Sequence, residues 1–476
     1  MDVLIVIGDQ DTYHENDDEI DASPIWLSDI LRDEGIVAQF VVHARRAEIL
    51  AEFGREDVIA AMRRHEIGLH GRDVHPVLPE VVEGLGWHAG VDAMRAVEGE
   101  EFKLLGRVFD VEPTCLSQHR HQAAPQAFGV ARELEVPYMF GYPGAGPTYS
   151  VSWYAGALSV PLNTPVPESL CFFPAVFDDA LPDDARFAEM FGRLQVHVAR
   201  CQANRLPLLV VFVCHPERLC YSGPLEQWQY GNGFNHDRTE VPRSVEKRRS
   251  RQEVEHALAN FRTVIRYLRD TPGLEPITTR EMTVRYGQQS SCIAHAELAE
   301  VAARALASGT IPVGGPLSAA DAVLGFAQAI VQSTEHGQLP ERVARIDVLG
   351  PTQPPPLAPE LPALARHDLA ELAGALVQES SASGHLPASL EVGRRRIGLG
   401  TLYGALATAY HAPANGQAPI ELTAWPRYPE LGIGLGNCHR LCTEDPLVRP
   451  GLSTDAAALH AQLQTWTLKS ASRNGA

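Results

Sequence analysis

Apolar runs and helical periodicities alternate along the first part of the chain. The apolar run DVLIVIG at 2–8 stops at an acidic segment, which is typical of a buried parallel strand that ends at a functional edge. Residues 24–34 then place apolar side chains at helical spacing, and Gly35 precedes a second apolar run at 36–42. A glycine directly after a helical pattern indicates a helix C-cap. The opening is therefore predicted to be a β-α-β unit.

The same alternation predicts the rest of the first domain. We expect helices at 55–64, 125–134, 184–203 and 250–270, and strands at 66–69, 137–141, 207–214 and near 276. Strands that alternate with helices imply a parallel sheet with both faces covered, and this many units can close into a barrel. Residues that carry chemistry are then expected just after the carboxyl ends of the strands.

Beyond about residue 286 the pattern changes to Ala- and Leu-rich helices with a Pro-rich break at 351–362. A helical pattern followed by Gly-x-(Ile/Leu)-Pro occurs at 309–312, 337–340 and 384–387. Each glycine predicts a left-handed C-cap, and the proline stops the helix. The unequal spacing favours a small stack of degenerate units over a long solenoid. We predict an α/β barrel domain at 1–285 and a smaller, mainly helical domain at 286–476.

Charge and composition narrow the class of protein. The 476 residues carry 40 Lys and Arg against 59 Asp and Glu, a net charge of −19 that opposes binding to nucleic acid. The first 34 residues hold eleven acids and one base, the reverse of an export or transit leader. No apolar run approaches the roughly 20 residues that span a bilayer. We expect a cytoplasmic protein without a membrane span, whose eight cysteines are reduced.

Polar residues suited to metal and proton chemistry follow three of the predicted strands. They are Asp9 and Asp11 after the first strand, His70, Asp73 and His75 after 66–69, and His215 after 207–214. Imidazole and carboxylate groups suit Zn, Fe, Mn and Co. The alternative for each is a solvated loop acid or a structural histidine.

Several segments together resemble a known family. DVLIVIGDQDT at 2–12, PIWLSDILRDEGIVAQFVV at 24–42 and RRHEIGLH at 63–70 resemble the NodB-like polysaccharide deacetylase superfamily, carbohydrate esterase family 4. The pair DxDT and HxxDxH looks closer to the branch with the deformylase that acts on undecaprenyl-phosphate-linked formamido-arabinose. SQHRHQAAPQAFGVARELEVPYMFG at 117–141 and VVFVCHPERL at 210–219 resemble later motifs. The resemblance covers roughly residues 1–285 and implies a metal-dependent distorted (β/α) barrel.

Carried over residue by residue, the resemblance implies a complete site. Asp9 would be the general base, Asp11 a metal ligand with His70 and His75, and His215 the general acid. Which of Asp9 and Asp11 is base and which is ligand stays open.

The sequence departs from the family in the spacing of its histidines. His70 and His75 are five residues apart rather than four, so a regular helix cannot present both rings, although Gly71 permits a bulge. The adjacent Asp-Asp of the family is replaced by DxD, and no Arg-Pro-Pro-Tyr motif is present.

Other candidates stand in the third motif region and in segments that read as loops. His119 and His121 are substitute ligands or substrate contacts, and Arg120 could hold a carboxylate or phosphate. Trp153 and Trp228 are candidates to stack on a sugar face, with a role as barrel roof as the alternative.

Two features of the C-terminal half have both functional and structural interpretations. Cys438-His439-x-x-Cys442 lacks a second ligand pair, which favours structural thiols. The C-terminal units resemble pseudomurein-binding repeats, which implies glycan or wall-polymer recognition. Docking, including homo-oligomer formation through these helices, is an equal alternative.

The sequence thus predicts a metal-dependent hydrolase of non-peptide carbon–nitrogen bonds that deacylates a polysaccharide or amino sugar. Zinc is the expected metal, with cobalt, manganese and iron as alternatives. A cyclic-amide or ureide hydrolase on the same barrel is the second hypothesis. An inactive glycan-binding protein is the third.

Overall fold

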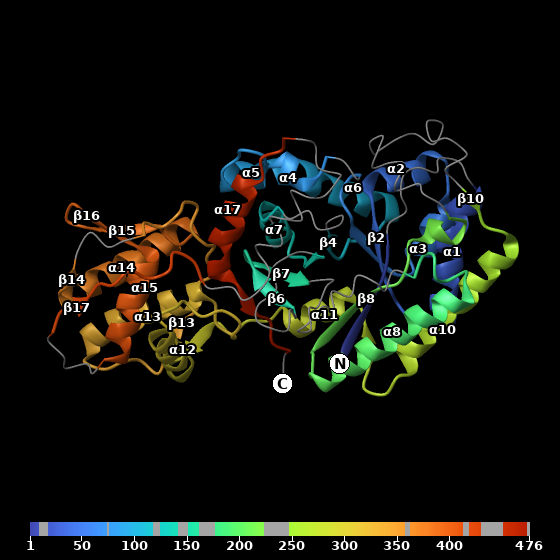
Figure 1. Ribbon diagram of the computed structural model, residues 1–476. Coiled ribbons are helices and arrows are strands. Elements are labelled where there is room, and N and C mark those ends of the chain that lie inside the picture. Colours follow the sequence, from blue (N-terminus) through green and yellow to red (C-terminus); the bar gives the residue numbers. More distant parts are fainter. Residues whose placement is uncertain are drawn as a thin grey trace.

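A computed structural model gives the fold of the chain in two groups of elements (Figure 1). It describes residues 1–8, 18–73, 76–117, 124–140, 151–160, 177–222, 247–357, 362–412, 418–429 and 451–473. A sheet and the helices that cover it form one group, and a smaller set of helices with short strand pairs forms the other. Each group has a large hydrophobic core of its own.

Ten strands of the described chain form one curled, mainly parallel sheet. The path runs β11-β1-β2-β3-β4-β5-β7-β6-β18, and β8 pairs with β1. The strands are β1 (Asp2–Ile7), β2 (Gln39–Val42), β3 (Glu66–Leu69), β4 (Leu116–Ser117), β5 (Tyr138–Met139), β6 (Ser152–Tyr154), β7 (Ala157–Val160), β8 (Leu208–Phe212), β11 (Glu275–Ile277) and β18 (Lys469–Ser470). The pairings of β6 with β7 and of β18 with β6 are antiparallel. The predicted α/β class with a parallel sheet is confirmed, while closure into a barrel stays a prediction.

The central strands β1, β2, β3 and β8 run parallel to one another, so their carboxyl ends lie at the same edge of the sheet. β1 pairs with β8 over Asp2–Val6, and its distal end pairs with β2 at Val6↔Gln39 and Ile7↔Phe40. Every residue of β1, β2 and β3 is buried. One face of the sheet packs against helices, and the other packs mainly against side chains of the same curled sheet. Burial on both faces explains why these strands are unbroken apolar runs.

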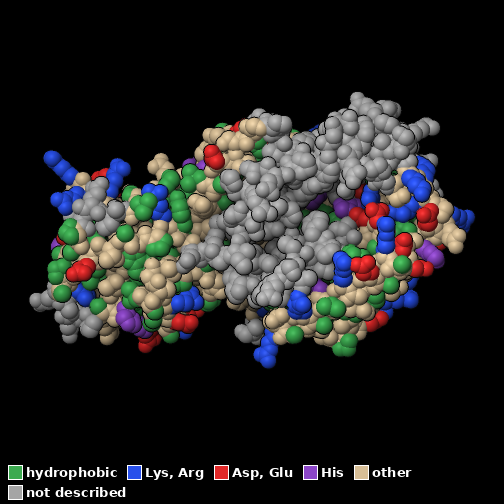
Figure 2. All heavy atoms as spheres, in the orientation of Figure 1, with side chains coloured by type: hydrophobic (Ala, Val, Ile, Leu, Met, Phe, Trp, Pro, Cys, Tyr) green, Lys and Arg blue, Asp and Glu red, His purple; other side chains and the backbone are tan. Residues whose placement is uncertain are grey.

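Most long helices of the first group lie where the sequence periodicity predicts them, although α1 starts well before the predicted residue 24 and several shorter helices were not predicted. The described helices of this group are α1 (Asp18–Asp33), α2 (Ala44–Glu52), α3 (Glu56–Met62), α4 (Leu78–Val81), α5 (Trp87–Met94), the π-helical turn η1 (Arg95–Gly99), α6 (Glu100–Phe109), α7 (Gln126–Glu133), α8 (Asp184–Ala203), the 3-10 turn η2 (Pro216–Leu219), α10 (Arg251–Asp270) and α11 (Thr279–Tyr286). A short hairpin joins β9 (Tyr221–Ser222) to β10 (Lys247–Arg248). The predicted helices at 55–64, 125–134, 184–203 and 250–270 are confirmed within two residues at each end. Side chains of both charge signs are interspersed over the face that carries α8 and α10 (Figure 2).

Among the described residues, the second group is built on four helices: α12 (His295–Ser308), α13 (Ala319–His336), α14 (Arg366–Ser383) and α15 (Leu399–His411). Three antiparallel pairs accompany them, formed by β12 (Cys292–Ala294) with β13 (Arg342–Ala344), β14 (Ala363–Leu364) with β17 (Ile420–Glu421), and β15 (Ser389–Val392) with β16 (Arg395–Gly398). Gly309, Gly337 and Gly384 end α12, α13 and α14 with φ of 67°, 74° and 70°. The predicted left-handed C-caps are therefore confirmed, whereas a likeness to pseudomurein-binding repeats stays a prediction.

The chain returns to the first sheet after the second group. Helix α17 (Asp455–Gln464) and the 3-10 turn η4 (Thr465–Thr467) lead into β18, which pairs with β6 at Lys469↔Trp153. The predicted boundary at 285/286 stays a prediction, and the structure adds this crossing back to β6. None of the helices in the described ranges is long and apolar enough to cross a bilayer.

Candidate active site at the carboxyl ends of the strands

A line of aromatic and imidazole rings runs across the carboxyl ends of the central strands. His43 follows β2, His70 follows β3, Phe140 follows β5, Phe212 ends β8, and His215 comes three residues later. Ring centroids are 5.1 Å apart for His43 and His70, and 6.0 Å apart for His70 and Phe140. The line continues with 5.9 Å from Phe140 to Phe212 and 4.9 Å from Phe212 to His215. Two predicted site residues, His70 and His215, thus flank one pair of phenylalanines.

The His70 ring is held by a hydroxyl group. Its Nδ1 lies 2.8 Å from Ser117 Oγ, and the same hydroxyl donates to the Leu69 carbonyl at 2.8 Å. Because the hydroxyl proton is used on Leu69, Ser117 Oγ accepts from Nδ1–H, which leaves the lone pair of His70 on Nε2. A metal-ligating histidine typically donates its other ring N–H to an oxygen in this way. The orientation of His70 therefore fits the predicted role as a metal ligand.

The His215 ring is held by a carboxylate. Asp178 Oδ1 accepts a hydrogen bond from the His215 backbone N–H, and Asp178 Oδ2 lies 2.8 Å from His215 Nδ1. The neighbouring Phe177 donates its N–H to the carbonyl of Val213 at 2.8 Å, which ties this turn to the end of β8. A carboxylate at Nδ1 fixes the ring and favours its protonated form. The orientation of His215 therefore fits the predicted role as general acid.

Gly8 lets the end of β1 approach these rings closely. A Cβ at Gly8 would lie 2.3 Å from Phe212 Cζ and 2.9 Å from His215 Cδ2. Since Cδ2 is bonded to Nε2, the edge of the His215 ring that carries Nε2 is turned toward the end of β1. Asp9, the predicted general base, is the next residue of the chain after Gly8.

A buried carboxylate lies near Gly71, the residue that follows His70. Glu98 sits on the π-helical turn η1 with 1% of its surface exposed, and burial raises its pKa to about 7 while His43 opposes that shift. π-helical turns are frequent at functional sites because they redirect a side chain. Gly71 adopts φ +77°, a conformation that glycine allows, and a Cβ there would lie 3.7 Å from Glu98 Oε1.

The remaining predicted site residues are placed elsewhere or not described. Asp9, Asp11, His75, His119, Arg120, His121 and Trp228 lie outside the described residues, as do Cys438, His439 and Cys442. Trp153 on β6 pairs with Leu158 in the first half of β7, toward the amino ends of the parallel strands. The structure thus does not bring it together with His70 and His215. Within the described ranges, no three His, Cys, Asp or Glu side chains are placed to hold a metal ion.

His65 and Glu66, which belong to the segment RRHEIGLH at 63–70, have structural roles at the amino end of β3. His65 Nε2 lies 3.0 Å from Ser28 Oγ, and burial lowers the pKa of His65 to about 4. Glu66 accepts hydrogen bonds from the backbone N–H groups of Thr279 and Arg280 at the start of α11. A carboxylate at a helix N-terminus satisfies donors that have no partner within the helix.

Sequence reasoning missed Asp178, His43, Ser117 and Glu98. His43 and Ser117 end apolar segments, as His70 does, so the rule that found His70 could have included them. Asp178 also follows an apolar stretch, CFFPAVF at 171–177, but it stands 37 residues before His215. Only the fold brings that pair together.

Comparisons with known proteins give faint structural similarity. No family model matches the chain, and no curated protein matches it. A mutant of the peptidoglycan deacetylase PdaC from Bacillus subtilis is 14% identical over 29% of this chain and 56% of that one, with a TM-score of 0.21. A family 4 carbohydrate esterase pseudoenzyme mutant with restored activity is 12% identical over 58% of this chain and 64% of that one, with a TM-score of 0.30. A deacetylase solved with substrate is 11% identical over 60% of this chain and 92% of that one, with a TM-score of 0.28.

These solved structures are deacetylases and a related pseudoenzyme, and the chain spans less than two thirds of the length of the first two. TM-scores of 0.30 or less do not establish a common fold. The functional assignment therefore rests on the residues themselves.

Proposed function

We propose that the protein is a metal-dependent hydrolase of non-peptide carbon–nitrogen bonds that removes an acyl group from an amino sugar of a glycan. The observation that carries the proposal is the arrangement of His70 and His215 at one edge of the sheet, each with its Nδ1 held by an oxygen. His70 would supply a nitrogen for the metal, and His215 would supply a proton donor. The phenylalanine pair Phe140 and Phe212 lies between them.

Hydrolysis of an amide at neutral pH needs a polarised carbonyl, an activated water and a proton for the departing amine. His215 can deliver that proton from Nε2, because Asp178 holds Nδ1 and stabilises the imidazolium. A carboxylate that orients an imidazole in this way fixes the ring nitrogen that faces the reaction. Asp9 is the residue we propose to take the proton from the attacking water.

Metal binding would begin at His70, whose Nε2 carries the ring lone pair, with Asp11 and His75 as the proposed further ligands. A divalent cation at this position would polarise the acyl carbonyl and lower the pKa of a bound water. The hydrogen bond from His70 to Ser117 prepares the ring for that role, since it holds both the tautomer and the ring plane.

Phe140 and Phe212 form an apolar wall between the two histidines. Phe140 is 6% exposed and Phe212 8%. An apolar wall excludes water from the reacting groups and strengthens the electrostatic interactions among them. An acetyl methyl group is a suitable partner for such a wall.

The decisive experiment measures acetate released from chitooligosaccharides by the zinc-loaded protein. His215→Ala should lower the rate by about 10²-fold or more, because it removes the proton donor. His70→Ala should lose stoichiometric metal in elemental analysis and retain the fold by circular dichroism. His367→Ala, in which the replaced ring is exposed on α14, is the matched control.

Two outcomes would contradict the proposal. One is full metal content in the His70→Ala variant. The other is turnover of small cyclic ureides without release of acetate from any N-acetylated sugar.

A further inference from the structure

A second cavity lies at the opposite end of the sheet from His70 and His215. Its volume is about 360 Å³, and it is bounded by the end of α7, the β6–β7 hairpin and α11. The apolar wall contains Val136, Trp153 and Leu158, and Glu135 and Gln288 add polar groups. Cavities of roughly 300 Å³ and above hold small-molecule ligands in proteins.

The register separates this cavity from the candidate active site. Trp153 pairs with Leu158, and the next residue of β7, Ser159, pairs with Tyr138 at the start of β5. The cavity therefore opens where the parallel strands begin, whereas His70 and His215 follow the points where strands end. One ligand ring cannot contact both places.

The wall that carries Trp153 is fixed by the surrounding structure. The hairpin turn uses Ala155 and Gly156, both in the left-handed region with φ of 46° and 77°. Ala155 N–H donates to Thr467 Oγ1 at 2.7 Å, and Tyr154 OH donates to the Ala461 carbonyl at 3.0 Å. These contacts with α17 and η4 preorganise the wall, which lowers the entropic cost of binding a ligand.

Polar groups of the cavity indicate what the ligand must offer. No hydrogen bond or ion pair found among the described residues uses the side chains of Glu135 or Gln288. Arg132 is already paired with Asp347 at 2.8 Å, so its charge is largely compensated. Both side chains are exposed beside the cavity, so they stay solvated and can exchange water for hydroxyl groups of a ligand. A pyranose ring offers apolar C–H faces for the indole and hydroxyl groups for Glu135 and Gln288.

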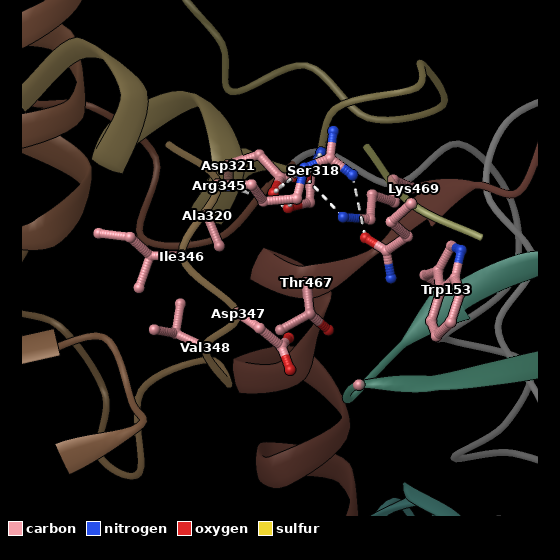
Figure 3. A pocket seen from close by; sticks show the side chains of 12 residues that line it. Trp153, Ser318, Ala320, Asp321, Arg345, Ile346, Asp347, Val348, Thr467 and Lys469 are labelled. Carbon is pink, nitrogen blue, oxygen red and sulfur yellow. Dashed lines mark hydrogen bonds and ion pairs between the residues drawn. The ribbon is translucent and has the colours of Figure 1, made fainter. Parts of the chain in front are cut away.

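A neighbouring cavity that Trp153 also lines is too small to hold part of the ligand. That cavity, of about 20 Å³, is also lined by Trp153, together with Ser318, Asp321 and Lys469. Figure 3 shows the indole at its edge, beside the ion cluster of Asp321 and Lys469. A volume near 20 Å³ holds about one water molecule. The sugar must therefore occupy the larger cavity alone.

We propose that this cavity is a second glycan-binding site, separate from the catalytic one, that takes one or two pyranose rings of an N-acetylated glucosamine chain against Trp153. The identity of the sugar rests on the proposed function. Two separate sites on one chain would raise the affinity for a polymer that reaches both of them.

The test measures binding of chitobiose by calorimetry to the full, metal-loaded His215→Ala variant, in which hydrolysis is suppressed. We expect a binding event that weakens about tenfold or more when Trp153→Ala is added, since stacking on an aromatic ring contributes that much. Trp153→Phe should restore most of the affinity, because it keeps the aromatic face. Glu135→Gln, at an exposed position, should weaken the same event several-fold, with Glu300→Gln on α12 as the matched control.

Each possible result has a definite meaning. Isotherms that coincide with and without Trp153→Ala, or the absence of chitobiose binding, would overturn the second site. Failure of the wild type to release acetate would overturn the proposed function instead. Loss of binding in Trp153→Ala that Trp153→Phe does not rescue, with Glu135→Gln unchanged, would also count against the sugar site.

Discussion

His70 and His215 differ in the group that holds Nδ1. Ser117 offers His70 a neutral hydroxyl, whereas Asp178 offers His215 a negative charge. A neutral partner leaves an imidazole suited to ligate a cation, and a carboxylate partner favours the imidazolium that can donate a proton. Under the proposed function, this difference at Nδ1 suits His70 to metal binding and His215 to proton donation.

Asp178→Asn tests that difference at the residue scale. Loss of the carboxylate should lower kcat for deacylation by about 10²-fold, because His215 loses both its orientation and its stabilised positive charge. The measurement is acetate release over a range of pH, with the fold checked by circular dichroism. Asp179→Asn is the matched control, since Asp179 pairs with Arg218 and Arg249 rather than with His215. Equal activity of the two variants would refute the role of Asp178.

Single residues could be predicted where chemistry follows a strand directly. His70 and His215 were found because an apolar run ends just before each of them. The Asp178–His215 contact could not be predicted, because a turn far along the chain supplies the carboxylate. The sequence identifies Trp153 as a candidate sugar contact. Its position at the amino ends of the strands depends on the β6–β7 hairpin, which the hydrophobic pattern does not predict.

At the scale of elements, one carboxylate joins two helices of the first group. Glu34, just after α1, contacts Arg262, Arg266 and Arg269 of α10 at 2.7, 3.0 and 2.6 Å. These three arginines stand at helical spacing on one face of α10. Hydrogen bonds, first from Arg266 and then from Arg262, lower the pKa of Glu34 to about 2.

The linkage between this pKa and folding gives a pH-dependent prediction. An unfolded chain binds a proton at Glu34 with a pKa near 4.5, so the ion cluster stabilises the fold fully above that value and loses its effect as pH falls toward 2. Glu34→Gln should therefore lower the urea midpoint at pH 7, and the difference from the wild type should shrink steadily below pH 4.5. A difference that stays constant from pH 7 to pH 3 would be inconsistent with the cluster.

Helices and central strands were predictable because their signals are local. The boundaries of α8, α10 and β3 match the sequence prediction because a cap or an apolar run marks each of them. The segment from α4 to α6 was not predicted, because a π-helical turn interrupts its periodicity. The two-residue strand β18 was not predicted either, since it is defined only by its pairing with β6.

At the scale of the whole molecule, a buried ion cluster joins the two groups of elements. Lys469 on β18 lies 2.7 Å from Asp321 near the start of α13, and Arg345 lies 3.5 Å from the same carboxylate. The side chains of Lys469 and Asp321 are 8% and 5% exposed. Removal of one member of such a pair is costly, because the partner charge stays buried.

Lys469→Met should lower the free energy of unfolding by about 3 kcal/mol. The double variant Asp321→Asn with Lys469→Met should lose less than the sum of the two single variants, because it removes both charges. Urea denaturation measures each value, with Lys103→Met as the exposed-pair control. Additive losses would show that the two side chains do not depend on one another.

The return of the chain to β6 has a consequence for the order of assembly. Residues 287–468 separate α11 from β18, and yet β18 supplies hydrogen bonds to the edge of the first sheet. In topological terms the second group is an insertion between α11 and β18, two elements that pack in the first group. During synthesis the ribosome must release both groups before that edge is covered. Until then β6 is an open strand edge that other chains can pair with.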